Sequence, residues 1–356
     1  MGWYLFLAAS PILLAPIVSG IYKTPIDKSD KTKKTYLIAC GIILFLMIAL
    51  RDKGLGSGDS TAYYNNWVKL SGISFSALQD FMKLSDMESG YLFSVWCLSR
   101  IFPSAQYVFV LTGLLFSVSI CRTIYRNSED SMLSMEICIC LGLYTFMIQG
   151  LRQAIAISIC LFAIECCKNR KLLRFLALIL LAYLFHRSSL VFLPVYFLYG
   201  FKFNVKTKIG MVMFAGVLLI FSPVLVMYGN QLMDREYFDT VDSGAVVAML
   251  IYIIILFTAF VFLNEKNTDR DKTFFIFMTV LGVSFYIMRY IGAQAMERIS
   301  YYFLIGQAIV LPTVVGKFDS TSRAIINYVV CFLSIALFIY RLNSSYGLEY
   351  MFFWEG

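Results

Sequence analysis

Long apolar segments recur along the whole chain, and they constrain its fold more than any other feature. A helix needs about 20 mostly apolar residues to cross roughly 30 Å of hydrocarbon. Only 15% of the 356 residues are charged and 60% are hydrophobic, whereas a soluble domain has about a quarter charged residues. We therefore predict an all-α, polytopic integral membrane protein with about 12 transmembrane helices. The candidate segments are 3–20, 36–50, 106–121, 132–149, 151–167, 172–186, 188–201, 208–228, 245–263, 273–290, 299–316 and 324–341.

Three of these segments differ from a typical transmembrane helix. The segments 172–186 and 188–201 are short and adjoin each other, so the number of helices is uncertain by one or two. The first segment has no charge before Lys23, whereas a signal peptide begins with a basic region and ends in a small-residue cleavage site. We interpret it as a retained first helix.

The distribution of Lys and Arg predicts the orientation of the chain. One alternating set of connections holds 19 of the 30 basic residues, which assigns that set to the cytoplasm and both termini to the outside. The net charge of +8 is then mainly a consequence of topology, and we expect no nucleic-acid partner. The nine Cys residues show no metal-binding spacing, so no metal site is predicted. The cytoplasmic set is 21–35, 122–131, 168–174, 202–208, 264–272 and 317–323.

One outward connection, 51–105, is much longer than the others. It contains GLGSGDS and the short apolar run YLFSVWCLSRIF. It is too aromatic for a disordered linker, so we expect short amphipathic or re-entrant helices at the membrane surface. Gly54, Gly56 and Gly58 would allow the backbone to turn tightly and to approach a ligand. No repeat or linker divides the chain, and we treat residues 1–356 as a single membrane domain with 51–105 as an external subregion.

Ionisable residues at the outer boundary are the candidate functional groups. Charges at membrane depth are costly, so they tend to face wet cavities and to have functions, although single residues of this kind also cap helices or snorkel to headgroups. Those of interest are Asp59, Glu88, Arg152, His186, Arg187, Arg289, Glu297 and Arg298.

Two of these residues lie in informative surroundings. Arg152, followed by Gln153, begins an outward-to-inward helix, where a guanidinium and free backbone N–H groups suit a phosphate or pyrophosphate. His186 is the only histidine and precedes Arg187 and two serines at an outer helix end. Such an imidazole can exchange a proton with a substrate hydroxyl, although a lone histidine is as often structural.

Aromatic residues surround these charges in the sequence. Aromatic rings stack on sugars, carboxylates hold hydroxyls and arginines hold phosphate, so the set suits a phosphorylated lipid that carries sugars. Tyr and Trp are also common in interfacial belts, which is the alternative interpretation. The aromatic residues are Tyr63, Tyr64, Trp67, Tyr91, Tyr290, Tyr301 and Tyr302.

Five short blocks in order resemble the EpsG family of polysaccharide polymerases. They are GSGDSTAYYNNW, MESGYLF, LRQAIA, FHRSS and ERISYYF, which match the family's Gly-Thr/Ser-Asp with a spaced Tyr, Glu-x-Gly-Tyr, Arg-Gln, Phe-His-x-Ser and late Arg with Tyr-Phe. The blocks lie between residues 56 and 312. The first departs slightly, because Ser57-Gly58-Asp59-Ser60 stands where the family usually has Gly-Thr-Asp.

The resemblance implies a Wzy-type polymerase with GT-C-like architecture in a bacterial plasma (inner) membrane. Such an enzyme transfers a growing glycan from undecaprenyl pyrophosphate to the non-reducing-end sugar of a lipid-linked repeat unit, on the periplasmic or exterior face. Its substrates are two undecaprenyl-pyrophosphate-linked oligosaccharides in the lipid bilayer, a chain-length regulator and a flippase are potential partners, and neither cofactor nor metal is required. The main alternatives are an O-antigen ligase-like glycosyltransferase and a lipid-linked oligosaccharide flippase.

These considerations assign roles to the candidate residues. We expect Arg152 to hold the donor pyrophosphate, helped by Arg289, Arg298 or Arg187. His186, or else Asp59, would orient or deprotonate the acceptor hydroxyl, with Glu88 as the third candidate for the base. Glycan contacts are expected from Tyr63, Tyr64, Tyr91 and Gln153.

Overall fold

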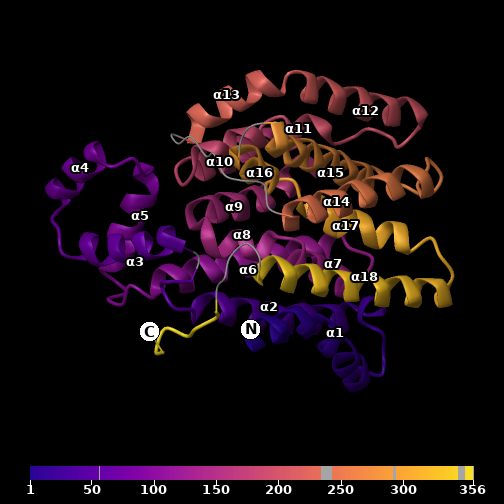
Figure 1. Ribbon diagram of the computed structural model, residues 1–356, viewed down its shortest axis with the longest axis horizontal. Coiled ribbons are helices and arrows are strands. Elements are labelled where there is room, and N and C mark those ends of the chain that lie inside the picture. The colour runs from indigo at the N-terminus through magenta and orange to yellow at the C-terminus, as the bar shows by residue number, and fades with distance from the viewer. Residues whose placement is uncertain (56, 234–242, 292–293, 344–348, 356) are drawn as a thin grey trace.

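The computed structural model describes residues 1–55, 57–233, 243–291, 294–343 and 349–355. Within these ranges the regular elements are helices, and the β-type pairing is an isolated antiparallel bridge between Arg51 and Phe352. Figure 1 shows the helices stacked roughly parallel to one another, with a separate lobe made of α3, α4 and α5 at one end of the stack. The all-α prediction is confirmed.

Six helices are long and apolar enough to cross a membrane, and two bent helix pairs raise the number to eight. The pair α7 (Ser131–Cys140) and α8 (Leu143–Gln149) bends by 44°, and α12 (Val205–Ile220) and α13 (Ser222–Met233) bend after Ile220 by 65°. The six long helices are α1 (Gly2–Tyr22), α2 (Asp30–Ala49), α6 (Tyr107–Asn127), α14 (Ser243–Phe262), α15 (Arg270–Met288) and α18 (Ser320–Arg341).

The other predicted segments are also helical, but they are shorter or carry more charge. The segment 172–201 contains a 12-residue helix, α10, followed by two short helices, because the α-helix ends before Leu184–His186. The predicted twelve helices therefore correspond to twelve helical regions, of which six to eight meet the requirements of a span. The remaining elements are η1 (Ile26–Lys28), α9 (Leu151–Lys168), α10 (Leu172–Tyr183), η2 (Arg187–Phe192), α11 (Val195–Leu198), η3 (Arg289–Ile291), α16 (Gln294–Ser300) and α17 (Ile305–Val315).

Four helices that follow predicted cytoplasmic connections begin with a capping side chain. Asp130, Asn204, Asp269 and Asp319 accept backbone N–H groups at the starts of α7, α12, α15 and α18, with N···O distances of 2.8–3.1 Å. Such caps satisfy N–H groups that have no partner within the helix. The caps therefore fix where these four helices begin.

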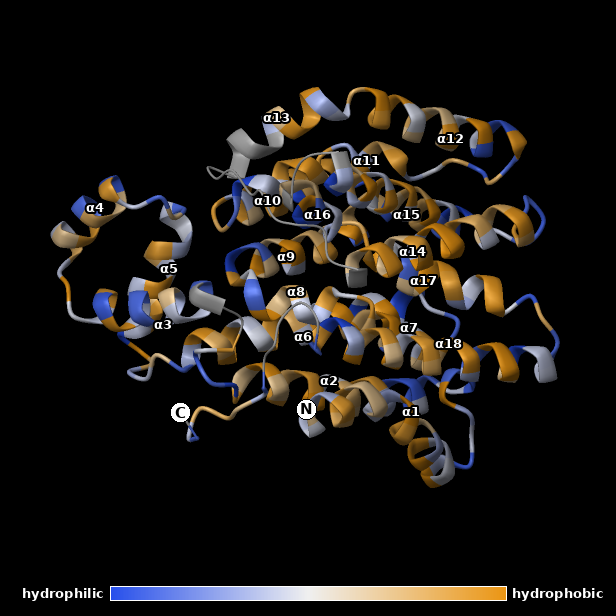
Figure 2. Ribbon diagram, in the orientation of Figure 1, coloured by the Kyte–Doolittle hydropathy of each residue, from blue (hydrophilic) through white to orange (hydrophobic). Residues whose placement is uncertain are grey.

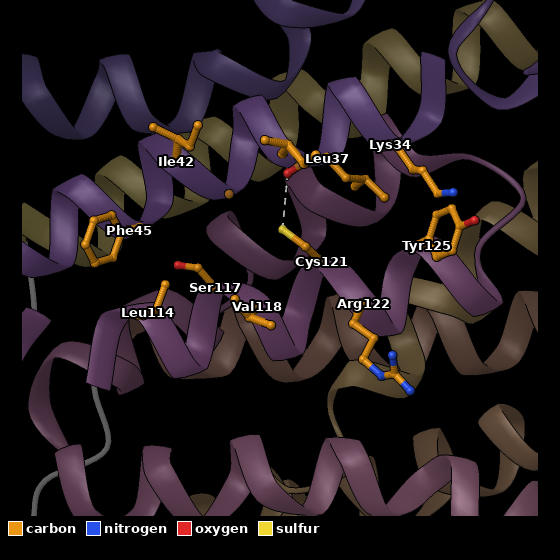
Figure 3. A pocket seen from close by; sticks show the side chains of 12 residues that line it. Lys34, Leu37, Ile42, Phe45, Leu114, Ser117, Val118, Cys121, Arg122 and Tyr125 are labelled. Carbon is orange, nitrogen blue, oxygen red and sulfur yellow. Dashed lines mark hydrogen bonds between the residues drawn. The ribbon is translucent and has the colours of Figure 1, made fainter. Parts of the chain in front are cut away.

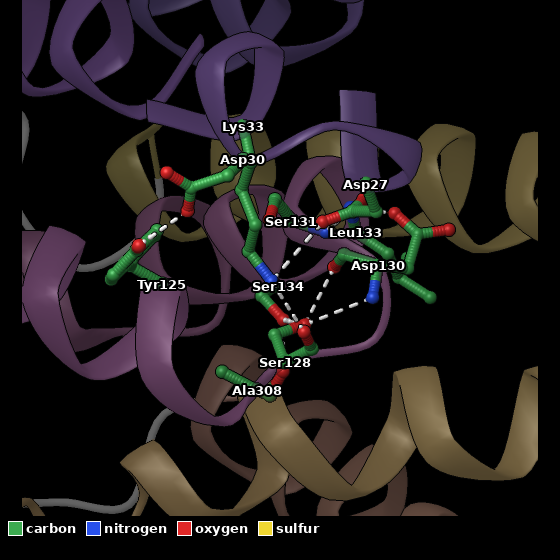
Figure 4. Close-up of polar contacts among 10 residues, drawn as sticks. All are labelled: Asp27, Asp30, Lys33, Tyr125, Ser128, Asp130, Ser131, Leu133, Ser134 and Ala308. Carbon is green, nitrogen blue, oxygen red and sulfur yellow. Dashed lines mark hydrogen bonds and ion pairs between the residues drawn. The ribbon is translucent and has the colours of Figure 1, made fainter. Parts of the chain in front are cut away.

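A polar cluster joins several elements at the end of the stack that the basic residues assign to the cytoplasm, which we call the cytoplasmic end (Figure 4). Asp27 accepts hydrogen bonds from the backbone N–H and the hydroxyl of Ser131, at 2.9 and 2.6 Å, and forms an ion pair with Lys33. Lys33 also donates to the Ser128 carbonyl at 2.7 Å. The hydroxyl of Ser134 donates to the Ala308 carbonyl in α17 at 2.5 Å. The cluster thus joins η1, α2, α7 and α17.

Hydrophobic residues make up most of the helices on the outside of the stack (Figure 2), and many of their large side chains are exposed. On α18, Phe332 is 72% exposed, and α12 and α14 likewise carry exposed Ile, Val and Phe residues. By contrast, α15 and α17 are almost fully buried at the centre. Apolar residues both in the core and on the exposed outside of the stack are typical of a protein whose outer surface is covered by lipid.

The external subregion 51–105 contains three helices: α3 (Ser57–Ser71), α4 (Phe75–Leu84) and α5 (Ser89–Ser99). They enclose a small core that includes Trp67, Leu78 and Tyr91 and that continues onto α6 and the start of α9. The expected glycine loop is shorter than predicted, because α3 begins at Ser57 and so includes Gly58. Gly54 lies in a turn where its N–H donates to Asp52 Oδ1 at 2.7 Å, and Gly56 lies outside the described residues.

Candidate active site

Arg152 lies at the junction between two helices, at the end of the stack that the basic residues assign to the outside, which we call the outer end. The bent half-helix α8 ends at Gln149, and α9 starts at Leu151 after Gly150. A Cβ atom at Gly150 would lie 3.0 Å from the ring of Phe146, so a small residue is favoured at this tight junction. Arg152 therefore lies in the first turn of α9, where unpaired N–H groups and the positive end of the helix dipole are found.

Arg152 is joined to the external lobe by a buried ion pair. Its Nη1 contacts Glu88 Oε2, and the two side chains are 17% and 10% exposed. The other Glu88 oxygen accepts the backbone N–H of Arg187 at 3.2 Å. Arg152 Nε also donates to the hydroxyl of Tyr63 at 3.4 Å. Arg152 and Glu88 thus join four separate parts of the sequence.

Gly90 allows the start of α5 to pack closely against Leu184. A Cβ atom on Gly90 would lie 2.5 Å from the Cβ and carbonyl oxygen of Leu184, so only glycine permits this approach. The backbone N–H of Tyr91 donates to the Leu184 carbonyl at 3.2 Å. The start of α5 is therefore docked on the connection between α10 and η2. This contact holds Glu88 beside Arg187.

His186 is 8% exposed and its ring is oriented by Ser188. Its Nδ1 accepts the backbone N–H of Ser188 at 3.3 Å and lies 2.7 Å from the Ser188 hydroxyl, which in turn is 3.1 Å from the hydroxyl of Tyr302. Because a backbone N–H can only donate, Nδ1 is the acceptor and the neutral ring carries its proton on Nε2. His186 is thus arranged as a hydrogen-bond donor through Nε2.

The charge state of His186 reports on its surroundings. Burial, followed by the positive charges of Arg152, Arg298 and Arg187, lowers its pKa to about 3. The imidazole is therefore neutral at physiological pH. Three arginines close enough to depress a histidine pKa indicate an electropositive region, even though Glu88 neutralises part of the charge.

Asp59 lies one helical turn before Tyr63 on α3, so the two share a helix face. Burial raises the pKa of Tyr63, nearby Arg152 and Arg298 lower it, and Asp59 raises it. Asp59 therefore lies within electrostatic reach of a tyrosine that contacts Arg152. The side chain of Asp59 is half-buried.

The remaining predicted arginines lie on a neighbouring buried layer. The amide of Gln153, which is 1% exposed, donates to the Arg298 carbonyl at 2.7 Å and so joins α9 to α16. Arg289 forms an ion pair with Glu297. Glu297 also accepts the hydroxyl of Tyr301 at 3.1 Å. Gln153 therefore contributes to the position of Arg298, and the charge of Arg289 is balanced by Glu297.

The predicted aromatic residues divide into two groups. Tyr63 and Tyr91 pack edge to face, with ring centroids 5.7 Å apart, directly beside Arg152. Tyr64 points elsewhere on α3 and lies under the ammonium group of Lys53, at 5.4 Å. Tyr64 is thus the one predicted glycan contact for which the described contacts lead away from Arg152.

Arg51 is a structural part of this region that the sequence pattern did not reveal. It is fully buried, and it donates to the carbonyls of Ile148 and Leu55 at 2.6 and 2.7 Å and to the hydroxyl of Ser60 at 3.1 Å. It therefore connects the end of α8 to the start of α3. The contact between Arg51 and Ile148 could not be predicted from the sequence, because the two residues are 97 positions apart.

Ser188 and Tyr302 were likewise not assigned roles as partners of His186. Ser188 belongs to the Phe-His-x-Ser block, so its spacing could have suggested the ring contact. The contact with Tyr302 depends on the tertiary fold. Among the described residues no group of three or more His, Cys, Asp or Glu side chains is placed to hold a metal ion.

The fold and the site define a class of protein. It is a polytopic membrane protein with arginines, a neutral histidine and carboxylates at its outer end, which suits an anionic, hydroxyl-bearing ligand. The model of the EpsG family matches residues 34–354, so the chain belongs to the EpsG family, the family of Wzy-type polysaccharide polymerases. No curated protein and no solved structure matches the chain significantly. Family membership implies a role like that of a polysaccharide polymerase.

Proposed function

We propose that the protein polymerises surface polysaccharide by joining oligosaccharide repeat units carried on undecaprenyl pyrophosphate, at the outer face of a bacterial plasma membrane. The growing glycan leaves its lipid carrier and is transferred to the non-reducing-end sugar of a new repeat unit, as in O-antigen polymerisation. The observation that carries the proposal is the buried pair of Arg152 with Glu88, which also accepts the Arg187 backbone N–H, in a member of this family.

The reaction forms one bond and breaks another at the same carbon. An acceptor hydroxyl oxygen attacks the anomeric carbon of the donor glycan, and the bond from that carbon to the pyrophosphate oxygen breaks. The pyrophosphate leaves with the electron pair and gains negative charge. Fixed positive groups that meet this charge contribute a large share of catalysis in such reactions.

The arginines provide this stabilisation in the proposed mechanism. Arg152 contacts the pyrophosphate, and Glu88 positions its guanidinium rather than serving as the base, because both Glu88 oxygens already accept hydrogen bonds. Arg187 and Arg298 add positive potential around the same place. A guanidinium held in one orientation matches phosphate oxygens better than a mobile one does.

Asp59 takes the proton of the acceptor hydroxyl, and His186 acts as a donor. The tautomer set by Ser188 leaves an Nε2–H group, which suits a sugar hydroxyl or a phosphate oxygen. With a pKa of about 3 the imidazole is a weak base. Asp59 is the carboxylate close to Tyr63 and is therefore assigned to the base.

Complementation of a polymerase-null strain tests this proposal. The variants Arg152→Ala, Asp59→Ala and His186→Ala are each expected to reduce long polysaccharide ladders, with single repeat units accumulating on the lipid carrier. Arg126→Gln is the matched control, because Arg126 is an arginine in an ion pair with Glu165 at the cytoplasmic end. Normal ladders from all three variants at wild-type protein levels would refute the site. Loss of glycan transfer to the final acceptor, with polymer intact, would indicate a ligase, and repeat units trapped on the inner leaflet would indicate a flippase.

A further inference from the structure

A lateral groove lies between α2 and α6, far from the site described above. Its volume is about 460 Å³, and its lining residues run along both helices (Figure 3). Lys34 and Arg122 mark one end, and Phe45 and Leu114 mark the other. Because α2 follows and α6 precedes a basic connection, the end with Lys34 and Arg122 belongs to the predicted cytoplasmic side.

Small side chains form the floor of the groove. A Cβ atom at Gly41 would lie 2.9 Å from the sulfur of Cys121, so the two helices approach closely there. The Cys121 thiol donates to the Leu37 carbonyl on α2 at 3.3 Å. Small residues allow membrane helices to pack at short range, and the larger residues beside them then stand up as walls.

The walls are apolar and face away from the stack. Ile38 and Ile42 on α2 are 62% and 52% exposed, and Leu114 and Val118 on α6 are 49% and 48% exposed. In a membrane this exposed surface meets hydrocarbon chains rather than water. At a rise of about 1.5 Å per residue, Lys34 and Phe45 are about 16 Å apart along α2. That length is close to one leaflet, or half of a hydrocarbon core of about 30 Å.

The cytoplasmic end of the groove carries positive charge. Arg122 is exposed and lies 5.8 Å from the centre of the Phe162 ring, and the ion pairs of the described residues do not include it. Lys34 forms an ion pair with Asp30 at 2.7 Å but keeps 55% of its side chain exposed. An ammonium group has three donors, so this pair leaves Lys34 able to bind a second anion.

Ser117 supplies a second polar contact inside the groove. Its side chain is 3% exposed, and its hydroxyl is buried without a hydrogen-bond partner in the part of the chain that the structure describes. Buried hydroxyls normally have a partner. Ser117 lies about 7.5 Å from Arg122 along α6, measured by the helical rise. This separation matches the thickness of one membrane interface, about 5–8 Å, in which lipid ester groups lie.

We propose that this groove binds a glycerophospholipid with an anionic headgroup from the cytoplasmic leaflet. The lipid phosphate lies between Arg122 and Lys34, an ester carbonyl accepts the Ser117 hydroxyl, and one acyl chain fills the groove towards Phe45. The site is separate from the proposed polymerase chemistry, because it opens at the opposite side of the membrane. A lipid held in this groove would exchange more slowly than the lipids that cover the other exposed helices.

Native mass spectrometry of the full chain released from nanodiscs tests whether the groove prefers an anionic headgroup. The nanodiscs contain equal amounts of phosphatidylglycerol and phosphatidylcholine. The wild type is expected to retain phosphatidylglycerol preferentially. The double variant Lys34→Gln/Arg122→Gln is expected to lower that preference about 30-fold, the combined effect of two basic residues near an anionic surface. The double variant Lys202→Gln/Lys206→Gln removes two other cytoplasmic charges and should retain the preference.

A second pair of variants tests the groove itself. Val118→Trp places a large ring in the groove without changing a charge and should abolish retention of both lipids. Ile254→Trp, on the exposed face of α14, introduces the same ring elsewhere and should leave retention unchanged. Equal retention of the two lipids by the wild type, or wild-type retention by Val118→Trp, would overturn the proposal. Thermal unfolding of each variant verifies that it is folded.

Discussion

The two polar ends of this helical protein use charge in different ways. At the cytoplasmic end, acidic and basic side chains join neighbouring elements, as in the contacts of Asp27 with Lys33 and Ser131, and carboxylates cap helix starts. At the outer end, Glu88 forms a buried ion pair with Arg152, and the positive charges of Arg152, Arg298 and Arg187 help to lower the pKa of His186. The cytoplasmic cluster around Asp27 joins elements to one another, whereas Glu88 at the outer end orients Arg152 within the candidate site.

The largest expected effect is the loss of Arg152. Replacing Arg152 with Gln should lower the rate of glycan transfer about 10²- to 10³-fold, the usual effect of removing one stabilising donor from a charged transition state. The rate is measured with purified protein and lipid-pyrophosphate-linked repeat units. Arg126→Gln, which breaks an ion pair at the cytoplasmic end, should change the rate less than twofold. An equal loss of transfer rate in the two variants would contradict a special role of the outer end in the reaction.

Gly90→Ala should weaken the docking of the external lobe. Its new Cβ atom meets the Leu184 backbone at 2.5 Å, so the start of α5 must move and carry Glu88 away from Arg187. We expect a loss of about 1–3 kcal/mol in stability, the usual cost of overpacking, together with reduced transfer. Thermal unfolding and the transfer assay measure the two effects. Gly210→Ala is the control, because no atom lies within 4 Å of a Cβ at Gly210.

The neutral state of His186 predicts a dependence of stability on pH. Its pKa in the folded protein is about 3, below the ordinary value of 6.5, so folding disfavours the protonated ring. The contribution to stability is complete above about pH 6.5 and is lost as the pH falls towards 3, at up to about 1.4 kcal/mol per pH unit. Between pH 6.5 and 5 the wild type should lose about 2 kcal/mol from this source.

His186→Asn should lack this part of the pH dependence. Ser188→Ala, which retains the histidine and its backbone contact, should keep most of it. Unfolding midpoints in detergent at several pH values provide the comparison. The same slope in the wild type and in His186→Asn would mean that folding does not shift the pKa of His186.

The smallest expected effect is at the cytoplasmic cluster. Asp27→Asn weakens the contacts to Lys33 and Ser131 and should cost about 1 kcal/mol in stability, the usual value of one hydrogen-bonded contact. Glycan transfer should remain within twofold of the wild type. A large loss of transfer with normal stability would show that the cytoplasmic end also takes part in the reaction.

Much of the fold follows from local patterns in the sequence. Apolar length predicted the helical segments, which the structure confirms. The caps that Asp130 and Asp269 supply to α7 and α15 were not predicted. The number of full spans did not follow, because the bends after Cys140 and Ile220 and the short length of α10 depend on tertiary packing. Gly58, which was expected in a tight turn, lies in the helix α3.

The contacts within the candidate site could not be read from the sequence. Arg152, Glu88 and His186 were proposed from their place at the predicted outer boundary, and that assignment stays a prediction. The pairing of Glu88 with Arg152 was not predicted, since 64 positions separate them. The orientation of His186 by Ser188 changes its proposed role from base to donor, and only the ring geometry reveals this change.

Binding of a lipid pyrophosphate tests the central claim most directly. Undecaprenyl pyrophosphate is titrated into wild-type protein, Arg152→Gln and Arg126→Gln in nanodiscs. The outer site requires that Arg152→Gln raise Kd about 10- to 100-fold, the value of a lost charge-assisted hydrogen bond, while Arg126→Gln binds like the wild type. Equal affinity of the wild type and Arg152→Gln would contradict the assignment of the outer arginines to the pyrophosphate.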